Sequence, residues 1–174
     1  MKLNAIVNLN TVEPISTHLN ITVQAIEIKA CRWMNQNGLS LLRLSLGIIF
    51  VWFGILKPFH LSPAQQLVED TIAFLMLPPE FVSILGYWEV AIGVFICFHS
   101  TTRLALVLLF LHMPGTMLPL VLLPDICWTQ FPYGLTMEGQ YIIKNLALVS
   151  AAILIGGTLH YQTLSGQNMP AALR

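Results

Sequence analysis

Long apolar stretches separated by short polar ones dominate the chain from residue 39 onward. A membrane-spanning helix needs roughly 20 mostly apolar residues, and four segments approach or meet that length: 39–59, 81–98, 104–123 and 141–159. Each must be helical inside a bilayer, because unpaired backbone groups cost too much free energy there. The pattern therefore predicts an all-α integral membrane protein with a four-helix transmembrane domain over residues 39–161.

The segments outside this domain have weaker patterns. In residues 1–38, apolar side chains recur at helical spacing, which predicts an amphipathic helix on the membrane surface that stops at Asn37-Gly38. The partial alternation of "ITVQAIEI" leaves a strand as the alternative. A short helix is expected in the first loop, capped by Ser62 with Pro63 and Gln65 following. Residues 162–174 are expected to form a tail.

Composition supports the membrane class. Of 174 residues, 56% are hydrophobic and only 9% are charged, whereas a typical soluble domain has about 25% charged residues. The mean hydropathy is +0.73. The formal net charge is zero without a basic run, so nothing indicates a nucleic-acid partner. The three cysteines form no C-x-x-C motif and no metal-type cluster, so we expect them to pack as small apolar side chains.

The distribution of basic residues predicts the orientation of the chain. Cytoplasmic flanks of membrane proteins are enriched in Lys and Arg. With both termini in the cytoplasm, the inner flanks hold most of the basic residues, while the outer side keeps only Lys57 and Lys144 at span ends. The basic residues on the inner side are Lys2, Lys29, Arg32, Arg43, Arg103 and Arg174. We therefore expect a multi-pass protein with both termini cytoplasmic.

Two helical stripes bring unusual residues onto packing faces. Residues 43, 47, 50, 54 and 57 of the first span are spaced 4, 3, 4 and 3, which places them on one helical face. The second span has a matching stripe with Glu89 between two glycines. Glycines in membrane helices mark close approach of a neighbouring backbone. The helix-packing residues are predicted to be Gly47, Gly54, Gly86 and Gly93.

The polar side chains in and next to the spans are candidates for a binding site. Intramembrane ionisable residues are costly and usually functional, and several lie at similar depth towards the outer side. The predicted ligand-binding residues of one outer-half pocket are Lys57, Glu89, Lys144, Tyr141, Asn145, His112 and Thr116. The structural alternative is that Lys57 and Glu89 only fix helix register, that Lys144 snorkels to water, and that His112 is a hydrogen-bonded core residue.

Three stretches of the chain resemble a known family. "RLSLGIIFVWFGILK", "GYWEVAIGV" and "EGQYIIKN" are similar to the DoxX-like superfamily of small four-helix membrane proteins, close to its reactive-chlorine resistance branch. The resemblance covers about residues 40 to 160. It implies a bacterial inner-membrane location and redox chemistry near quinone, since relatives include a subunit of thiosulfate:quinone oxidoreductase. Lys57 and Glu89 occupy positions of the family pattern, without an implied catalytic role.

The expected function is a redox-associated membrane component that binds quinone or a small oxidised substrate in the outer-half pocket. No intrinsic cofactor or metal motif is visible, so electrons would come from a redox partner protein or a larger membrane complex. A homo-oligomer and the question of enzymatic activity are left open. The alternatives are a non-catalytic anchor or assembly subunit and a carrier of small solutes or lipids.

The predicted orientation is testable by cysteine labelling in a background without the native cysteines. Trp128→Cys is expected to react with a membrane-impermeant maleimide from outside, whereas Asn168→Cys should react only after permeabilisation, because the two positions lie on opposite sides of the last span. The reverse labelling pattern would overturn the orientation.

Overall fold

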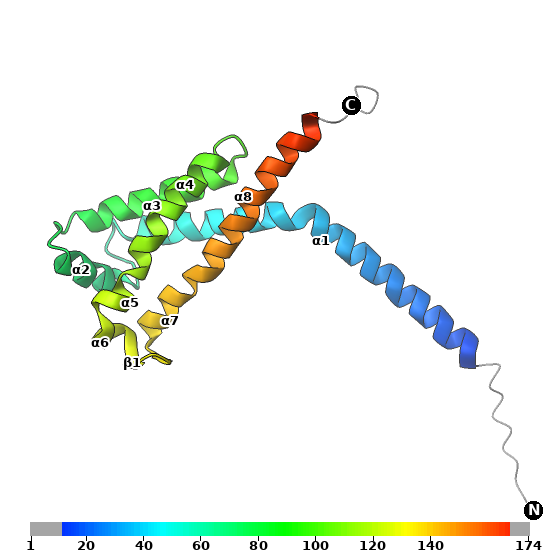
Figure 1. The fold of residues 1–174 in the computed structure, drawn as a ribbon, viewed down its shortest axis with the longest axis horizontal. Helices are drawn as coiled ribbons and strands as arrows, with labels where there is room; N and C mark the ends of the chain where they lie inside the picture. Colours follow the sequence, from blue (N-terminus) through cyan, green and yellow to red (C-terminus); the bar gives the residue numbers. More distant parts are fainter. Residues whose placement is uncertain (1–11, 168–174) are drawn as a thin grey trace, which may run out of the picture. The chain divides into compact units, whose positions relative to one another are not determined.

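Helices make up most of the chain (Figure 1). A computed structural model describes the backbone of residues 12–167 and side chains within residues 23–159. The chain divides into two units, Met1–Leu41 and Leu42–Arg174. Helix α1, Val12–Leu56, contributes residues to both units. The second unit contains every residue of the predicted binding site.

Within the described residues, three helical stretches are long and apolar enough to cross a membrane: Val23–Leu56, Thr102–Leu122 and Met137–Leu159. This confirms the prediction of a mostly helical protein with helices that could span a membrane. Helix α3, Phe81–Cys97, is equally apolar but has only 17 residues, which correspond to about 26 Å at 1.5 Å per residue. The fourth crossing therefore stays a prediction.

The predicted helix stop at Asn37-Gly38 is wrong. Helix α1 continues through both residues without interruption, and the strand alternative for "ITVQAIEI" is wrong for the same reason. Asn37 is accommodated because its side-chain amide donates to the backbone carbonyl of Trp33 at 2.9 Å, within the helix. A glycine inside a helix costs only about 1 kcal/mol relative to alanine, which a long apolar helix tolerates. Residues 1–11 of the predicted extension lie outside the described residues.

The predicted helix of the first loop is present as α2, Gln65–Phe74, but its predicted cap is wrong. The residue that precedes the helix is Ala64, and no side chain caps the first turn. Ser62 takes part through its backbone carbonyl, which accepts from the Gln65 N–H at 3.0 Å. The Gln65 amide instead donates to Glu69 Oε1 at 2.7 Å. A side-chain bond along the helix has replaced the capping box.

Prolines divide the third predicted span. Helix α4, Thr102–Met117, contains Pro114, and the chain continues as two four-residue helices. These are α5, Pro119–Leu122, and α6, Pro124–Cys127, each with its proline at the start. Proline has no N–H to donate to the preceding turn but suits a first helical position. The predicted single helix over 104–123 is therefore divided into α4 and α5, and α6 follows directly after it.

The region before the last span holds a hairpin that the sequence pattern did not predict. Strand β1, Trp128–Gln130, pairs antiparallel with β2, Gly134–Leu135. Helices α7, Met137–Ile143, and α8, Asn145–Gln167, follow, with Lys144 between them. Because α8 extends to residue 167, the first part of the predicted tail is helical.

Packing within the second unit runs in sequence from one helix to the next (Figure 1). Helix α3 packs mainly against α4, and α4 in turn packs against α8. A small apolar core joins the short elements near the start of α7. Its buried members are Leu67, Cys127 and Ile142, surrounded by Met117, Leu120, Leu123, Ile126 and Trp128. We call the end of the unit where α1 stops, directly before Lys57, the Lys57 end. The opposite end, where Arg43 lies on α1, is the Arg43 end.

The close approach of α1 to α3 depends on two pairs of facing glycines. A Cβ placed on Gly86 would lie 2.7 Å from the Gly54 carbonyl oxygen, and a Cβ on Gly54 would lie 2.7 Å from that of Gly86. Gly93 stands in the same relation to Gly47, whose carbonyl oxygen would be 2.7 Å from the added atom. The helix backbones are therefore nearer than any larger side chain permits.

Gly86→Ala is expected to lower the free energy of unfolding by about 1–3 kcal/mol, because the added methyl group forces two backbones apart. The matched control is Gly157→Ala on α8, where an added Cβ meets nothing within 4 Å and alanine favours the helix. Melting temperatures in detergent check both variants. Equal melting temperatures for the two variants would contradict the packing role of Gly86.

Candidate functional site

A buried triad of Lys57, Glu89 and His112 lies at the Lys57 end of the second unit. The Lys57 ammonium pairs with Glu89 Oε2, and His112 Nε2 lies 2.9 Å from Glu89 Oε1. The exposed fractions are 7% for Lys57, 8% for Glu89 and 7% for His112. The Glu89 carboxylate thus contacts side chains from two other segments in the interior of the bundle.

Local sequence explains how each member is positioned. Lys57 directly follows the last residue of α1 and precedes Pro58, so its backbone leaves the helix while its long side chain turns inward. Glu89 lies in the middle of α3 on the glycine-lined face. His112 lies on α4 two residues before Pro114. Lys57 contributes reach, while the two helical residues are held by their backbones.

The facing glycines bring the first two members together. A Cβ on Gly54 would lie 2.9 Å from Glu89 Cβ, and a Cβ on Gly86 would lie 2.9 Å from Lys57 Cβ. The absence of side chains at these two positions is what allows the stems of Lys57 and Glu89 to lie beside the opposite backbone. The glycine contact and the ion pair are therefore one structural unit.

Mutual neutralisation explains why charged groups are stable here. A lone carboxylate at bilayer depth costs at least several kcal/mol, and a buried pair reduces that cost when its remaining lone pairs are also hydrogen-bonded. Both Glu89 oxygens have a partner. The carboxylate is thus paired on one oxygen and hydrogen-bonded on the other.

Lys57 and His112 keep hydrogen-bonding capacity beyond their contacts with Glu89. An ammonium has three N–H donors, and among the bonds of the described residues Lys57 uses one, to Glu89. In the same described part of the chain, His112 bonds through Nε2 only, which leaves its second ring nitrogen, Nδ1. The site can therefore donate to an added acceptor without giving up the Glu89 contacts.

Thr116 and Asn145 form a second polar contact one helical turn further along α4. Asn145 Nδ2 donates to Thr116 Oγ1 at 3.2 Å, which links α8 to α4. Thr116 Oγ1 in turn donates to the Met113 carbonyl at 2.8 Å. His112 and Thr116 are four residues apart and share a face of α4. Polar contacts thus continue from α1 through α3 and α4 to α8.

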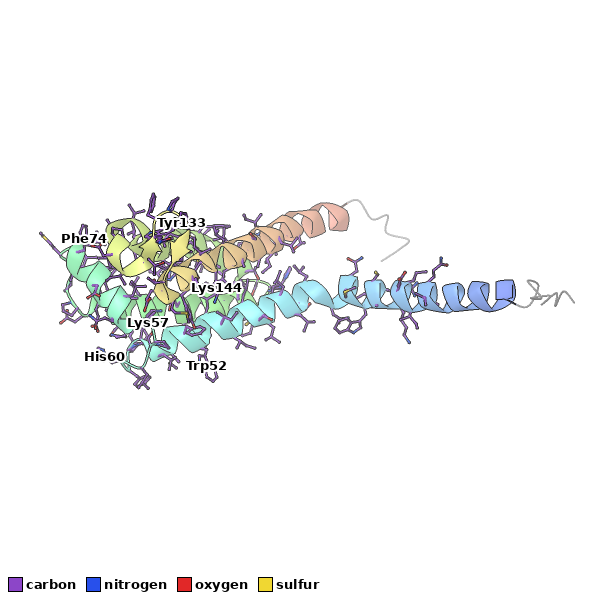
Figure 2. All side chains as sticks on the ribbon, turned by 90° about the horizontal axis from the view of Figure 1, so that it is seen from below. Trp52, Lys57, His60, Phe74, Tyr133 and Lys144 are labelled. Carbon is purple, nitrogen blue, oxygen red and sulfur yellow. The ribbon has the colours of Figure 1, made fainter. Side chains whose placement is uncertain are left out.

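Lys144 and Tyr141 form a separate, exposed pair. The Lys144 ammonium lies 5.5 Å from the centre of the Tyr141 ring, and the tyrosine is 52% exposed. Lys57 lies at the end of α1, whereas Lys144 lies at the junction of α7 and α8 (Figure 2). Of the seven predicted ligand residues, three thus meet in the triad and two in the neighbouring contact, while the last two contact each other.

Arg43 makes contacts that sequence reasoning missed. Instead of only snorkelling from the end of its span, its guanidinium donates from Nε and Nη2 to the Ile96 carbonyl, both at 3.1 Å. Nη2 also donates to Thr102 Oγ1 at 2.7 Å, and Nη1 lies 3.3 Å from His99 Nδ1. Arg43 therefore ties α1 to the connection between α3 and α4. The sequence signal for these contacts was that Arg43 lies on the same helical face as Lys57.

The cysteines and the described acidic and histidine side chains do not gather into a metal centre. Within residues 23–159, no group of three or more His, Cys, Asp or Glu could hold a metal ion. Cys31 and Cys97 are exposed free thiols, and Cys127 is a buried one. Burial raises the pKa of the Cys127 thiol, with the charge of Glu138 contributing in the same direction. Cys127 therefore stays protonated and packs in its apolar core.

Comparison with known proteins yields no match: no family model fits the sequence, and no curated protein and no solved structure shows significant similarity to it.

A double-mutant cycle tests the energetic coupling of Lys57 with Glu89. Lys57→Met and Glu89→Gln are each expected to destabilise the protein, because removing one partner of a buried pair leaves an uncompensated charge or polar group, at a cost of roughly 3–5 kcal/mol. The double variant should recover part of this loss. Unfolding free energies in detergent provide the measurement, and strictly additive losses would contradict the pairing.

Proposed function

We propose that this protein is a multi-pass, redox-associated membrane component that binds a quinone, or a small oxidised substrate with similar carbonyl groups, at the Lys57–Glu89–His112 triad. The observation that carries the proposal is the unused N–H groups of Lys57 and the unpaired Nδ1 of His112 beside a fully partnered carboxylate. Nδ1 of His112 donates in the imidazolium form, because Glu89 accepts the Nε2 hydrogen. Small-molecule sites in proteins are mostly apolar with a few well-placed polar groups. A buried donor pair inside an apolar bundle fits that description.

The triad also provides a path for protons. Reduction of a quinone to a quinol takes up two electrons and two protons. Glu89 bridges an ammonium and an imidazole, and all three groups exchange protons with hydrogen-bonded neighbours. In the proposed role, Lys57 and the imidazolium form of His112 bind the two carbonyl oxygens and deliver one proton each, while Glu89 holds both in place. Electrons come from a redox partner protein.

The resemblance to the DoxX-like superfamily supports the same proposal. Lys57 and Glu89 stand in two of the three stretches that carry the resemblance, and relatives of that superfamily act near quinone. The proposed arrangement has four crossings: α1, α3, α4 with α5, and α7 with α8. It places the protein in a bacterial inner membrane with both termini in the cytoplasm.

A non-catalytic anchor or assembly subunit is the second candidate. Two sets of polar contacts favour it. The Lys57–Glu89–His112 triad and the contacts of Arg43 each join the α1 segment to α3 and α4. Buried polar groups of this kind can fix helix register without binding any ligand. In that case the triad would contribute to specificity of assembly alone.

His112→Gln separates the two candidates. The glutamine amide can still donate to Glu89 Oε1, but it lacks a second ring nitrogen and an imidazole proton. We expect the melting temperature to stay close to that of the wild type, while affinity for decylubiquinone, measured by calorimetry in detergent, falls by about tenfold, the equivalent of one lost hydrogen bond of about 1.4 kcal/mol.

Tyr141→Phe is the matched control for the binding assay. It removes a hydroxyl from a predicted ligand residue that the structure places in the exposed pair with Lys144, so it should leave quinone affinity unchanged. If wild-type protein binds no decylubiquinone, the anchor function replaces the proposal. If His112→Gln and Tyr141→Phe bind alike, the quinone site lies elsewhere.

A further inference from the structure

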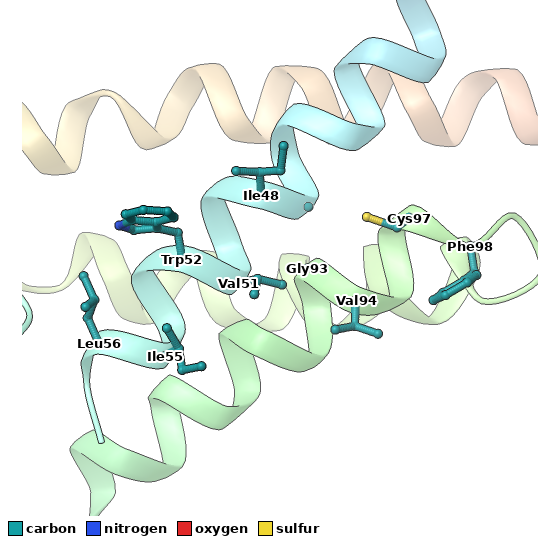
Figure 3. A pocket seen from close by; sticks show the side chains of 10 residues that line it. Ile48, Val51, Trp52, Ile55, Leu56, Gly93, Val94, Cys97 and Phe98 are labelled. Carbon is teal, nitrogen blue, oxygen red and sulfur yellow. The ribbon is translucent and has the colours of Figure 1, made fainter. Parts of the chain in front are cut away.

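An apolar groove runs along the outside of the α1–α3 contact (Figure 3). Ten residues line it, six from α1 and four from α3 and the residue that follows it. Its volume is about 640 Å³, which lies within the 300–1,000 Å³ range of small-molecule sites. Gly47 and Gly93 form part of its lining, where the backbones of α1 and α3 approach closely.

The side chains of the groove determine what kind of group it accepts. The walls are aliphatic and aromatic, with Ile48 and Trp52 on one side and Val94 and Phe98 on the other (Figure 3). Trp52 is 65% exposed and Phe98 is 60% exposed. No charged side chain lines the groove. A hydrocarbon group fits this chemistry, whereas a polar occupant would lose its hydrogen bonds.

The length of the groove matches one acyl chain of a phospholipid. From Gly47 to Leu56 the groove follows nine residue steps of α1, about 14 Å at 1.5 Å per residue, close to half of the roughly 30 Å hydrocarbon core of a bilayer. An acyl chain extends over about one leaflet, which is half of that core.

Charge at one end of the groove favours an anionic headgroup. Phe98 at that end is followed by His99, which contacts Arg43, and exposed Arg103 lies next to Thr102, another Arg43 contact. Residues 39–47 and 96–105 contain no Asp or Glu. At the other end, the nearest cation, Lys57, is already paired with Glu89. A phosphate is therefore attracted to the Arg43 end.

We propose that this groove is a binding site for one membrane phospholipid, with an acyl chain between α1 and α3 and its phosphate at the Arg43 end near Arg103. The chain lies in the groove beside the helix contact, and the headgroup pairs with the cationic end. The lipid thereby completes the surface of the α1–α3 contact. This site is independent of the proposed quinone function.

Native mass spectrometry of delipidated full-length protein titrated with phosphatidylglycerol tests the proposal. Wild-type protein is expected to retain one lipid per chain. Val94→Trp fills the groove and should reduce that occupancy by about tenfold, in keeping with overpacking of a formed site. Val107→Trp, an equally large change at an exposed valine of α4, should not. Arg103→Gln should weaken phosphatidylglycerol binding but leave diacylglycerol binding unchanged.

The unmodified chain offers a second measurement, which does not depend on the folding of a variant. Cys97 lines the groove, so phosphatidylglycerol should slow its alkylation by a membrane-soluble maleimide, while alkylation of exposed Cys31 continues at the same rate. Equal occupancy in the two tryptophan variants, or an unchanged Cys97 rate, would overturn the site. A polyprenyl quinone that displaces phosphatidylglycerol would overturn the phospholipid as its occupant.

Discussion

A carboxylate inside an apolar bundle must have partners, and this requirement organises the second unit. Glu89 satisfies it with one cation and one imidazole, taken from the segments on either side of α3 in the sequence. The glycine pairs contribute to this contact because they let the stems of Lys57 and Glu89 lie beside the opposite backbone. Helix separation, helix register and charge compensation are thus three aspects of one contact.

Helical periodicity was sufficient to anticipate much of this arrangement. The spacing of 4, 3, 4 and 3 put Lys57 on the same face as Gly54, and an equal spacing put Glu89 between Gly86 and Gly93. These features are predictable because they depend on the regular geometry of a single helix. His112 was included because its predicted depth in the third span is similar to that of Glu89 in the second, so the two side chains could meet.

Features that depend on where helices bend or how loops fold were not predictable in the same way. Tyr141 and Lys144 were predicted to share a pocket with the triad, yet their side chains contact each other because the two residues are three apart in the chain. Ser62 has the right spacing for a cap, but the Gln65 amide finds a partner within its own helix. Arg43 was assigned to the inner flank by its charge alone, whereas its guanidinium also donates to the Ile96 carbonyl near the end of α3.

In the proposed arrangement with four crossings, the position of Glu89 on α3 has a consequence for membrane insertion. A nascent α3 entering the bilayer alone would carry an uncompensated charge, at a cost of about 3 kcal/mol on insertion scales. Lys57 has by then already emerged, only 32 residues earlier in the chain. The α1–α3 hairpin can therefore enter the lipid as a neutral unit, and His112 joins it when α4 follows. The order of the three residues along the chain is thus also the order in which the charge on the carboxylate is first neutralised and then enclosed.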